Sequence, residues 1–142
     1  MPGPCAVKTE PELKGSSLDW DGRVAAAHAG VAALQGQFLA QFAADRASLK
    51  TMIAEVGAEP TQTELEPIRR LAHDLKGKGE VFCFAIISMI AASLHAYLGG
   101  AAPSVDGIKA HVAALAQVVE FDLTGDGGEQ GRKILERLAN ST

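Results

Sequence analysis

Apolar residues recur every three or four positions along most of this chain, a spacing that places them on one face of an α-helix. The pattern runs over residues 31–56, 61–78, 84–98, 104–119 and 129–140. No segment has the alternation of apolar and polar residues that is typical of a β-strand. We therefore predict an all-α fold, and the short connections between long helices favour an up-and-down four-helix bundle.

The N-terminal region differs from the rest of the chain. Residues 1–16 are rich in Pro, Gly, Lys and Glu, and we predict that they form a flexible tail before a single helical domain over residues 17–142. Gly30 and Gly36 are weak points in the first helical pattern. We therefore expect the residues before them to form an additional N-terminal helical segment, packed across or beside the bundle.

Several helix boundaries carry recognisable signals. Gly57 ends the first long pattern, and Thr61 or Thr63 then starts the next helix. Ser104 is placed to cap the helix that follows Pro103. These signals divide residues 31–119 into helices of ordinary length.

Composition and charge narrow the class of protein. Of the 142 residues, 47% are apolar but only 5% are aromatic, so the core must consist mainly of Ala, Leu, Val and Ile. The formal net charge of -4 argues against a general nucleic-acid surface. The N-terminus does not resemble a signal peptide, and the longest apolar stretch, Val81–Ile90, is too short to span a bilayer. We expect no membrane partner.

The two cysteines, Cys5 and Cys83, do not have the spacing of metal ligands. Cys83 lies in an apolar run, where a buried free thiol is the ordinary outcome. Because the sequence also shows no leader pattern, we expect the chain to lie in a reducing cytoplasm.

His73 is the most informative polar residue, because it lies off the apolar stripe of the second long helix. The stripe consists of Leu65, Ile68, Ala72, Leu75, Gly79 and Phe82. By the helical spacing rule, His73 shares the opposite face with Glu66, Arg69, Arg70, Lys76, Gly77 and Glu80. A histidine with no task on a solvated helix face is the alternative interpretation, but it leaves Gly77 unexplained.

Gly77 lies one helical turn after His73 on the same face. A glycine inside a helix costs about 1 kcal/mol relative to alanine, so its presence calls for a reason. A bare patch beside the imidazole would let another protein approach the ring closely. Lys76, Lys78, Arg69 and Arg70 would add positive potential for a phosphoryl group, although a merely solvated basic face explains Arg69 and Arg70 equally well.

The run His73-Asp74-Leu75-Lys76-Gly77 in an acidic, all-α chain resembles the motif of histidine-phosphotransfer (HPt) domains, here of the bacterial stand-alone type. The resemblance extends from about Glu64 to Leu98, and Gly79 agrees with it. Cys83 departs from it, because many members have glycine at the turn into the next helix. The resemblance implies a phosphoprotein that shuttles a phosphoryl group between receiver-domain aspartates of a hybrid kinase and a response regulator.

In that family the phosphoacceptor is the histidine of the motif, which here is His73. Its neutral imidazole attacks the receiver's acyl phosphate, and an unperturbed imidazole is largely neutral in the cytoplasm. Lys76 would balance phosphate charge and Gly77 would clear the docking face, with Glu66, Arg69, Arg70, Lys78 and Glu80 around them. The resemblance implies no cofactor bound by this chain, Mg²⁺ on the partner receiver, and a monomer.

The same helix also suits two other functions. The dimerisation domain of a sensor histidine kinase has a proline soon after its histidine, where this chain has Gly77-Lys78, and no residues remain for an ATP-binding domain. We therefore expect a phosphocarrier without autokinase activity. The alternative from another class is a non-catalytic helical interaction module that docks a signalling partner through the same face.

The remaining constellations are weaker. The segment Asp122–Gly127 resembles the opening of an EF-hand loop, but Lys133 stands where the bidentate Glu is needed, so we expect an acidic turn and no metal. His28, His95 and His111 lack the spacing of a zinc-binding helix, and ordinary surface or partly buried roles are expected for them.

Overall fold

A computed structural model describes residues 17–141, which form five α-helices and no strand. The helices are α1 (Ser17–Ala54), α2 (Gln62–Val81), α3 (Ala85–Leu98), α4 (Val105–Glu120) and α5 (Gly128–Ser141). The predicted all-α class is therefore confirmed. The predicted tail over residues 1–16 lies outside the described residues. No helix in the described part of the chain combines the length and the apolar character needed to cross a membrane.

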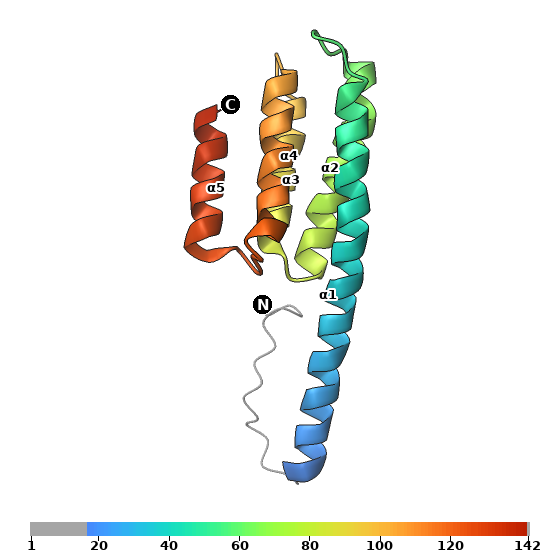
Figure 1. The fold of residues 1–142 in the computed structure, drawn as a ribbon, viewed down its shortest axis with the longest axis vertical. Helices are drawn as coiled ribbons and strands as arrows, with labels where there is room; N and C mark the ends of the chain where they lie inside the picture. Colours follow the sequence, from blue (N-terminus) through green and yellow to red (C-terminus); the bar gives the residue numbers. More distant parts are fainter. Residues whose placement is uncertain (1–16, 142) are drawn as a thin grey trace.

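Successive helices run in opposite directions (Figure 1). The most extensive packing is between α2 and α3, and α4 packs against α3 on one side and α1 on another. α1 also contacts α2, while α5 packs on α4 and on one end of α3. In this arrangement α2 has both a face turned to the core and a face turned to solvent.

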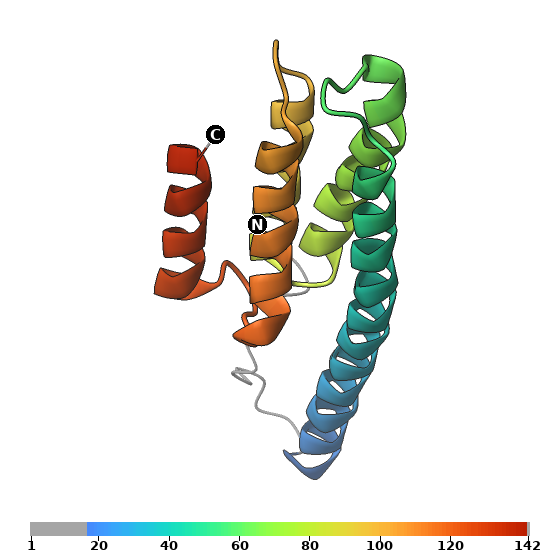
Figure 2. The same ribbon diagram turned by 45° about the horizontal axis from the view of Figure 1, so that its top comes forward.

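α1 is longer than the sequence indicated. We expected a separate helical piece before Gly30 and Gly36, but a single helix runs from Ser17 to Ala54. Its N-terminal half extends past the ends of the other helices (Figures 1 and 2). A glycine costs a helix only about 1 kcal/mol and need not break it. Leu34, which belongs to the predicted apolar stripe, is 51% exposed, so the stripe of α1 is not buried along its whole length.

The core is mainly aliphatic, as the composition indicated. Its largest fully buried side chains are Phe42, Leu49, Leu65, Ile68, Leu75, Ile86, Ile87, Ile90, Leu94, Leu98, Ile108 and Leu115. Four phenylalanines gather at one place, where Phe38 of α1 stacks on Phe42 at 5.9 Å, on Phe82 at 5.2 Å and on Phe84 at 5.4 Å between ring centroids. Phe82 itself is only partly buried. This cluster holds α1 against the turn between α2 and α3.

The start of α2 is fixed by a reciprocal pair of hydrogen bonds. The Glu64 amide donates to Thr61 Oγ1 at 3.1 Å, and the Thr61 amide donates to Glu64 Oε1 at 2.9 Å. This is a capping box, which satisfies two amides that a helix start leaves free. Hydrogen bonds from the backbone amides of Thr61 and Gly57 lower the pKa of the Glu64 carboxyl. Ser104 caps α4 in a similar way by accepting from the Gly107 amide at 3.1 Å.

The turn between α2 and α3 brings the two helices unusually close. A Cβ atom added at Gly79 would lie 2.7 Å from the Ser88 nitrogen and 2.9 Å from the Phe84 carbonyl oxygen. Glycine is therefore required at this position. The Ser88 hydroxyl also donates to the Lys76 carbonyl oxygen at 2.6 Å, which ties α3 to α2 below His73.

Cys83 occupies this turn with φ of +71°, a left-handed conformation that favours glycine. This backbone conformation therefore explains why a glycine would suit position 83. Cys83 is buried, as predicted, but the prediction of a free thiol is wrong, because Cys83 is disulfide-bonded. The other cysteine of the chain, Cys5, lies outside the described residues.

Candidate functional site

His73 projects from the exposed face of α2. The opposite face of α2 is buried against the other helices. Its buried residues are Leu65, Ile68, Ala72, Leu75 and Gly79. His73 is exposed, as are Asp74, Lys76, Gly77 and Lys78. The helical pattern therefore placed the imidazole correctly, on a firmly packed helix and in contact with solvent.

Gly77 and Gly79 have opposite surroundings although only one residue separates them. A Cβ added at Gly77 meets no heavy atom within 4 Å, whereas one added at Gly79 collides with the backbone of α3. The packing of the described residues thus gives no reason for a glycine at position 77. The reason must lie in something that approaches α2 from outside, or there is none.

A shallow hollow of about 490 Å³ lies next to the imidazole. It is lined by His73, Asp74, Gly77, Lys78, Val81 and Phe82. Val81 is 59% exposed, so the hollow combines apolar surface with the polar groups around His73. Such a surface suits a protein partner better than a small molecule, because it is open and has no enclosed volume.

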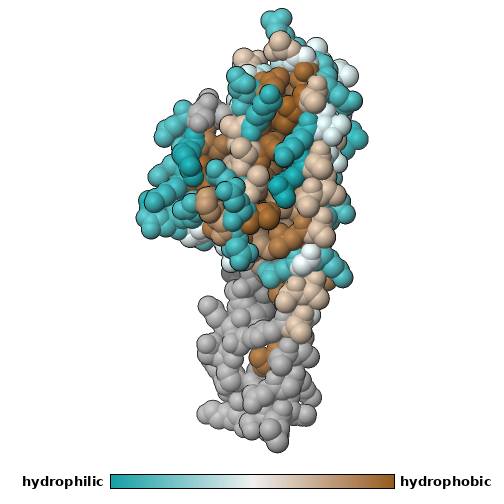
Figure 3. Space-filling view, viewed as in Figure 1, coloured by the Kyte–Doolittle hydropathy of each residue, from teal (hydrophilic) through white to brown (hydrophobic). Residues whose placement is uncertain are grey.

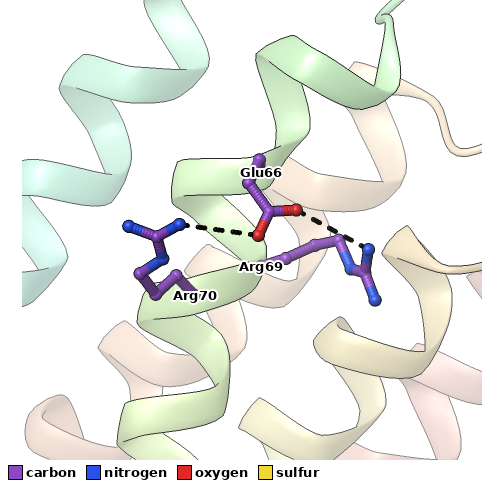
Figure 4. Close-up of polar contacts among 3 residues, drawn as sticks. All are labelled: Glu66, Arg69 and Arg70. Atoms are coloured by element: carbon purple, nitrogen blue, oxygen red, sulfur yellow. Dashed lines mark ion pairs between the residues drawn. The ribbon is translucent and has the colours of Figure 1, made fainter.

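The two arginines before His73 share one carboxylate. Glu66 lies 3.8 Å from a guanidinium nitrogen of Arg69 and 3.8 Å from one of Arg70 (Figure 4). At this distance the pairs are ionic contacts without hydrogen-bond geometry, and exposed pairs of this kind contribute about 0–1 kcal/mol. Arg70 is exposed and Arg69 partly buried. One carboxylate therefore offsets only part of the positive charge of the two arginines, one turn before the imidazole.

The basic residues that follow His73 in α2 differ from the two arginines in having no carboxylate partner among the described residues. In the described part of the chain the ammonium groups of Lys76 and Lys78 form no ion pair, and both side chains are exposed. Glu80 is also exposed. Of the predicted basic residues, Lys76 and Lys78 are therefore the two that no carboxylate of the described residues pairs.

A second imidazole lies beside His73, and sequence reasoning missed it. The ring of His95, on α3, has its centroid 5.7 Å from that of His73, with the ring planes tilted by 45°. The signal was available in principle, because His73 and His95 are equally far along the chain from Phe84, at the turn between two antiparallel helices. The helical pattern alone does not reveal which faces of α2 and α3 meet.

His111 has a structural role. It is fully buried, its Nδ1–H donates to the Gly107 carbonyl oxygen at 2.8 Å, and its Nε2 accepts from the Ser93 hydroxyl at 2.9 Å. The carbonyl can only accept, which fixes the proton of the neutral ring on Nδ1. Burial lowers the pKa of His111. Tyr97 stacks on the ring with centroids 5.5 Å apart.

Another hollow, with a volume of about 780 Å³, lies between α1 and α4. Its floor includes Ile53, Val56 and Val112, and Lys50 and Lys109 flank it. Figure 3 shows apolar surface in this region between polar side chains. No residue of α2 lines it, so it is not part of the surface around His73.

The glycine-rich segment after α4 supports the α2–α3 turn. The Gly125 amide donates to the Cys83 carbonyl oxygen at 3.0 Å, and the Gly125 carbonyl oxygen accepts from the Ile86 amide at 2.7 Å. These bonds tie the predicted acidic turn to the start of α3. Among residues 17–141 no group of three His, Cys, Asp or Glu side chains is arranged to hold a metal ion.

Comparisons of the chain with known protein families, with curated proteins and with solved structures find no match. The geometry described above must therefore carry the functional argument.

Proposed function

We propose that this chain is a histidine-containing phosphotransfer protein that carries a phosphoryl group between receiver-domain aspartates. The observation that carries the proposal is His73. Its imidazole is exposed on a well-packed helix, hydrogen-bonds no group in the described part of the chain, and adjoins both the open surface at Gly77 and the unpaired Lys76.

The chemistry requires little of this chain beyond positioning. A nitrogen lone pair of the neutral His73 ring attacks the phosphorus of an aspartyl phosphate, the P–O bond breaks, and its electron pair returns to the aspartate carboxylate. The reverse reaction passes the phosphoryl group to the next receiver. Lys76 offsets the negative charge of the transferred group, and the Mg²⁺ that the chemistry needs would be bound by the receiver.

The proposal includes the architecture. The contacts of α1 with α2 and α4, and of α3 with the same two helices, support an up-and-down four-helix bundle on which α5 packs. The bundle would act as a monomer and present α2 to its partner. Glu66, Arg69, Arg70, Lys78 and Glu80 would surround the contact, without a role for nucleic acid or a membrane.

A phosphorelay of this kind operates in the cytoplasm, and the proposal places the chain there. A disulfide is unusual in that compartment. Quantifying the free thiols of protein isolated under acid quench measures whether the bond at Cys83 forms there.

The test is incubation with candidate receiver domains that carry labelled aspartyl phosphate. We expect acid-labile, base-stable label to move to this chain, and a His73→Gln variant to take up none while keeping its helicity and melting temperature. Substitutions of exposed residues usually change stability by about 0.5 kcal/mol or less. With ATP and Mg²⁺ alone, the chain should stay unlabelled.

The labelling results distinguish a phosphotransfer protein from a kinase fragment and from a non-catalytic interaction module. Undiminished labelling of the His73→Gln protein would place the phosphoacceptor elsewhere, and stoichiometric labelling from ATP alone would indicate a kinase fragment. Binding of an unphosphorylated receiver with no transfer from a phosphorylated one would favour the non-catalytic interaction module.

A further inference from the structure

The imidazole rings of His73 on α2 and His95 on α3 lie close together. His73 and His95 have ring centroids 5.7 Å apart, and the tilt of 45° leaves the rings unstacked. Within the described residues no group hydrogen-bonds either ring. A phosphoryl group on one ring would therefore be within reach of the other.

The contrast with His111 indicates that His95 is not a structural histidine. Both ring nitrogens of His111 are used by Gly107 and Ser93, and the ring is fully buried. His95 is only partly buried. A histidine that stabilised the α2–α3 contact would be expected to have its nitrogens satisfied in the same way.

We propose that His95 is a second phosphoryl-binding residue, whose protonated ring donates a hydrogen bond to an oxygen of the phosphoryl group on His73. This inference rests on the proposed function of His73. As the P–N bond to His73 forms and the aspartate leaves with its electron pair, the dianionic phosphoryl group arrives beside His95. His95 takes one proton from solvent and thereby offsets part of that charge.

The charges around His95 are compatible with a proton there. His95 lies in the last turn of α3, where the helix dipole favours a cation, and α3 has no Asp, Glu, Lys or Arg. α5 contacts α3 near Ile86, at the opposite end of the helix. The ionisable residues of α2 within one turn of His73 are Arg69, Arg70, Asp74 and Lys76, and those of α4 are Asp106, Lys109, His111 and Glu120.

The test uses phosphoramidate, a small reagent that phosphorylates histidine without a receiver. The ring resonances of His95 are followed by NMR against pH before and after phosphorylation of His73. We expect the proton-binding constant of His95 to rise about tenfold, the lower end for a hydrogen bond to a charged group. Because linkage is reciprocal, replacing His95 with Gln should make the phosphoryl group hold its own last proton about tenfold more tightly, read from its ³¹P shift.

The matched control is the His73→Gln protein treated with the same reagent, in which the His95 titration should not move. An unchanged His95 titration on phosphorylated wild-type protein overturns the inference, and so does modification of His95 in preference to His73. Failure of receivers to label His73 refutes the proposed function instead, and leaves a coupling measured with phosphoramidate intact. Circular dichroism of His95→Gln checks that the fold persists.

Discussion

Alanine at Gly77 should stabilise the fold and slow phosphoryl transfer, whereas alanine at Gly79 should destabilise it. At Gly77 the new methyl group meets no heavy atom within 4 Å, so only the gain in helix propensity remains, up to about 1 kcal/mol. For a domain of this size that raises Tm by about 3 °C. At Gly79 the methyl group would lie 2.7 Å from a backbone nitrogen of α3, which cannot rotate away. Separating α2 from α3 should cost about 1–3 kcal/mol.

The assay measures Tm and the rate of transfer from a phosphorylated receiver for wild type, Gly77→Ala, Gly77→Leu and Gly79→Ala. We expect transfer to fall slightly for Gly77→Ala and by about a hundredfold for Gly77→Leu, because a misplacement of about 1 Å at the reacting atoms has that effect. Gly77→Leu at the wild-type rate would refute the role of Gly77 as clearance for the partner. Gly79→Ala with an undiminished Tm would refute the close approach of the helices.

Three further predictions follow from other parts of the molecule. Lys76→Glu should weaken receiver binding more than Arg70→Glu, because Glu66 already offsets Arg70, and a salt series that ranks them the other way would contradict this. Burial lowers the pKa of His111, so its contribution to the free energy of unfolding is complete above the unfolded value near pH 6.5 and is lost as pH falls through the folded pKa. Denaturation from pH 8 to 5 should show that loss, and His111→Gln should reduce it. Asp122 has φ of +53°, so Asp122→Gly should raise the free energy of unfolding by up to about 1 kcal/mol, measured by denaturant titration.

Apart from the unbroken course of α1 through Gly30 and Gly36, the sequence predicted the features that depend on one helix at a time. The period of the apolar residues identified the buried face of α2, and Leu65, Ile68 and Leu75 are fully buried. The same period left His73 and Gly77 on the exposed face. Local chemistry also pointed to the caps, since Ser104 and Thr61, one of the two threonines predicted to start α2, each accept a hydrogen bond from the amide three residues on.

The sequence did not predict the features that depend on contacts between different parts of the chain. Leu34 fits the apolar stripe of α1 but is 51% exposed, whereas Phe38 and Phe42 of the same stripe are buried. A periodic pattern shows which face a helix can bury and says nothing about whether a partner is present. Likewise, the apolar run around Cys83 predicted burial and gave no sign of its disulfide, which depends on the path of the rest of the chain.

The register between α2 and α3 shows how features of single residues determine contacts between helices. Gly79 permits the close approach, the turn at Cys83 reverses the chain, and Ser88 bonds the Lys76 carbonyl. Once these are fixed, His73 and His95 must meet, because antiparallel helices pair residues at equal distances from their turn. A glycine required by packing thus determines the surroundings of a histidine on the exposed face, so a substitution at Gly79 should disturb the His73–His95 pair as well as the core.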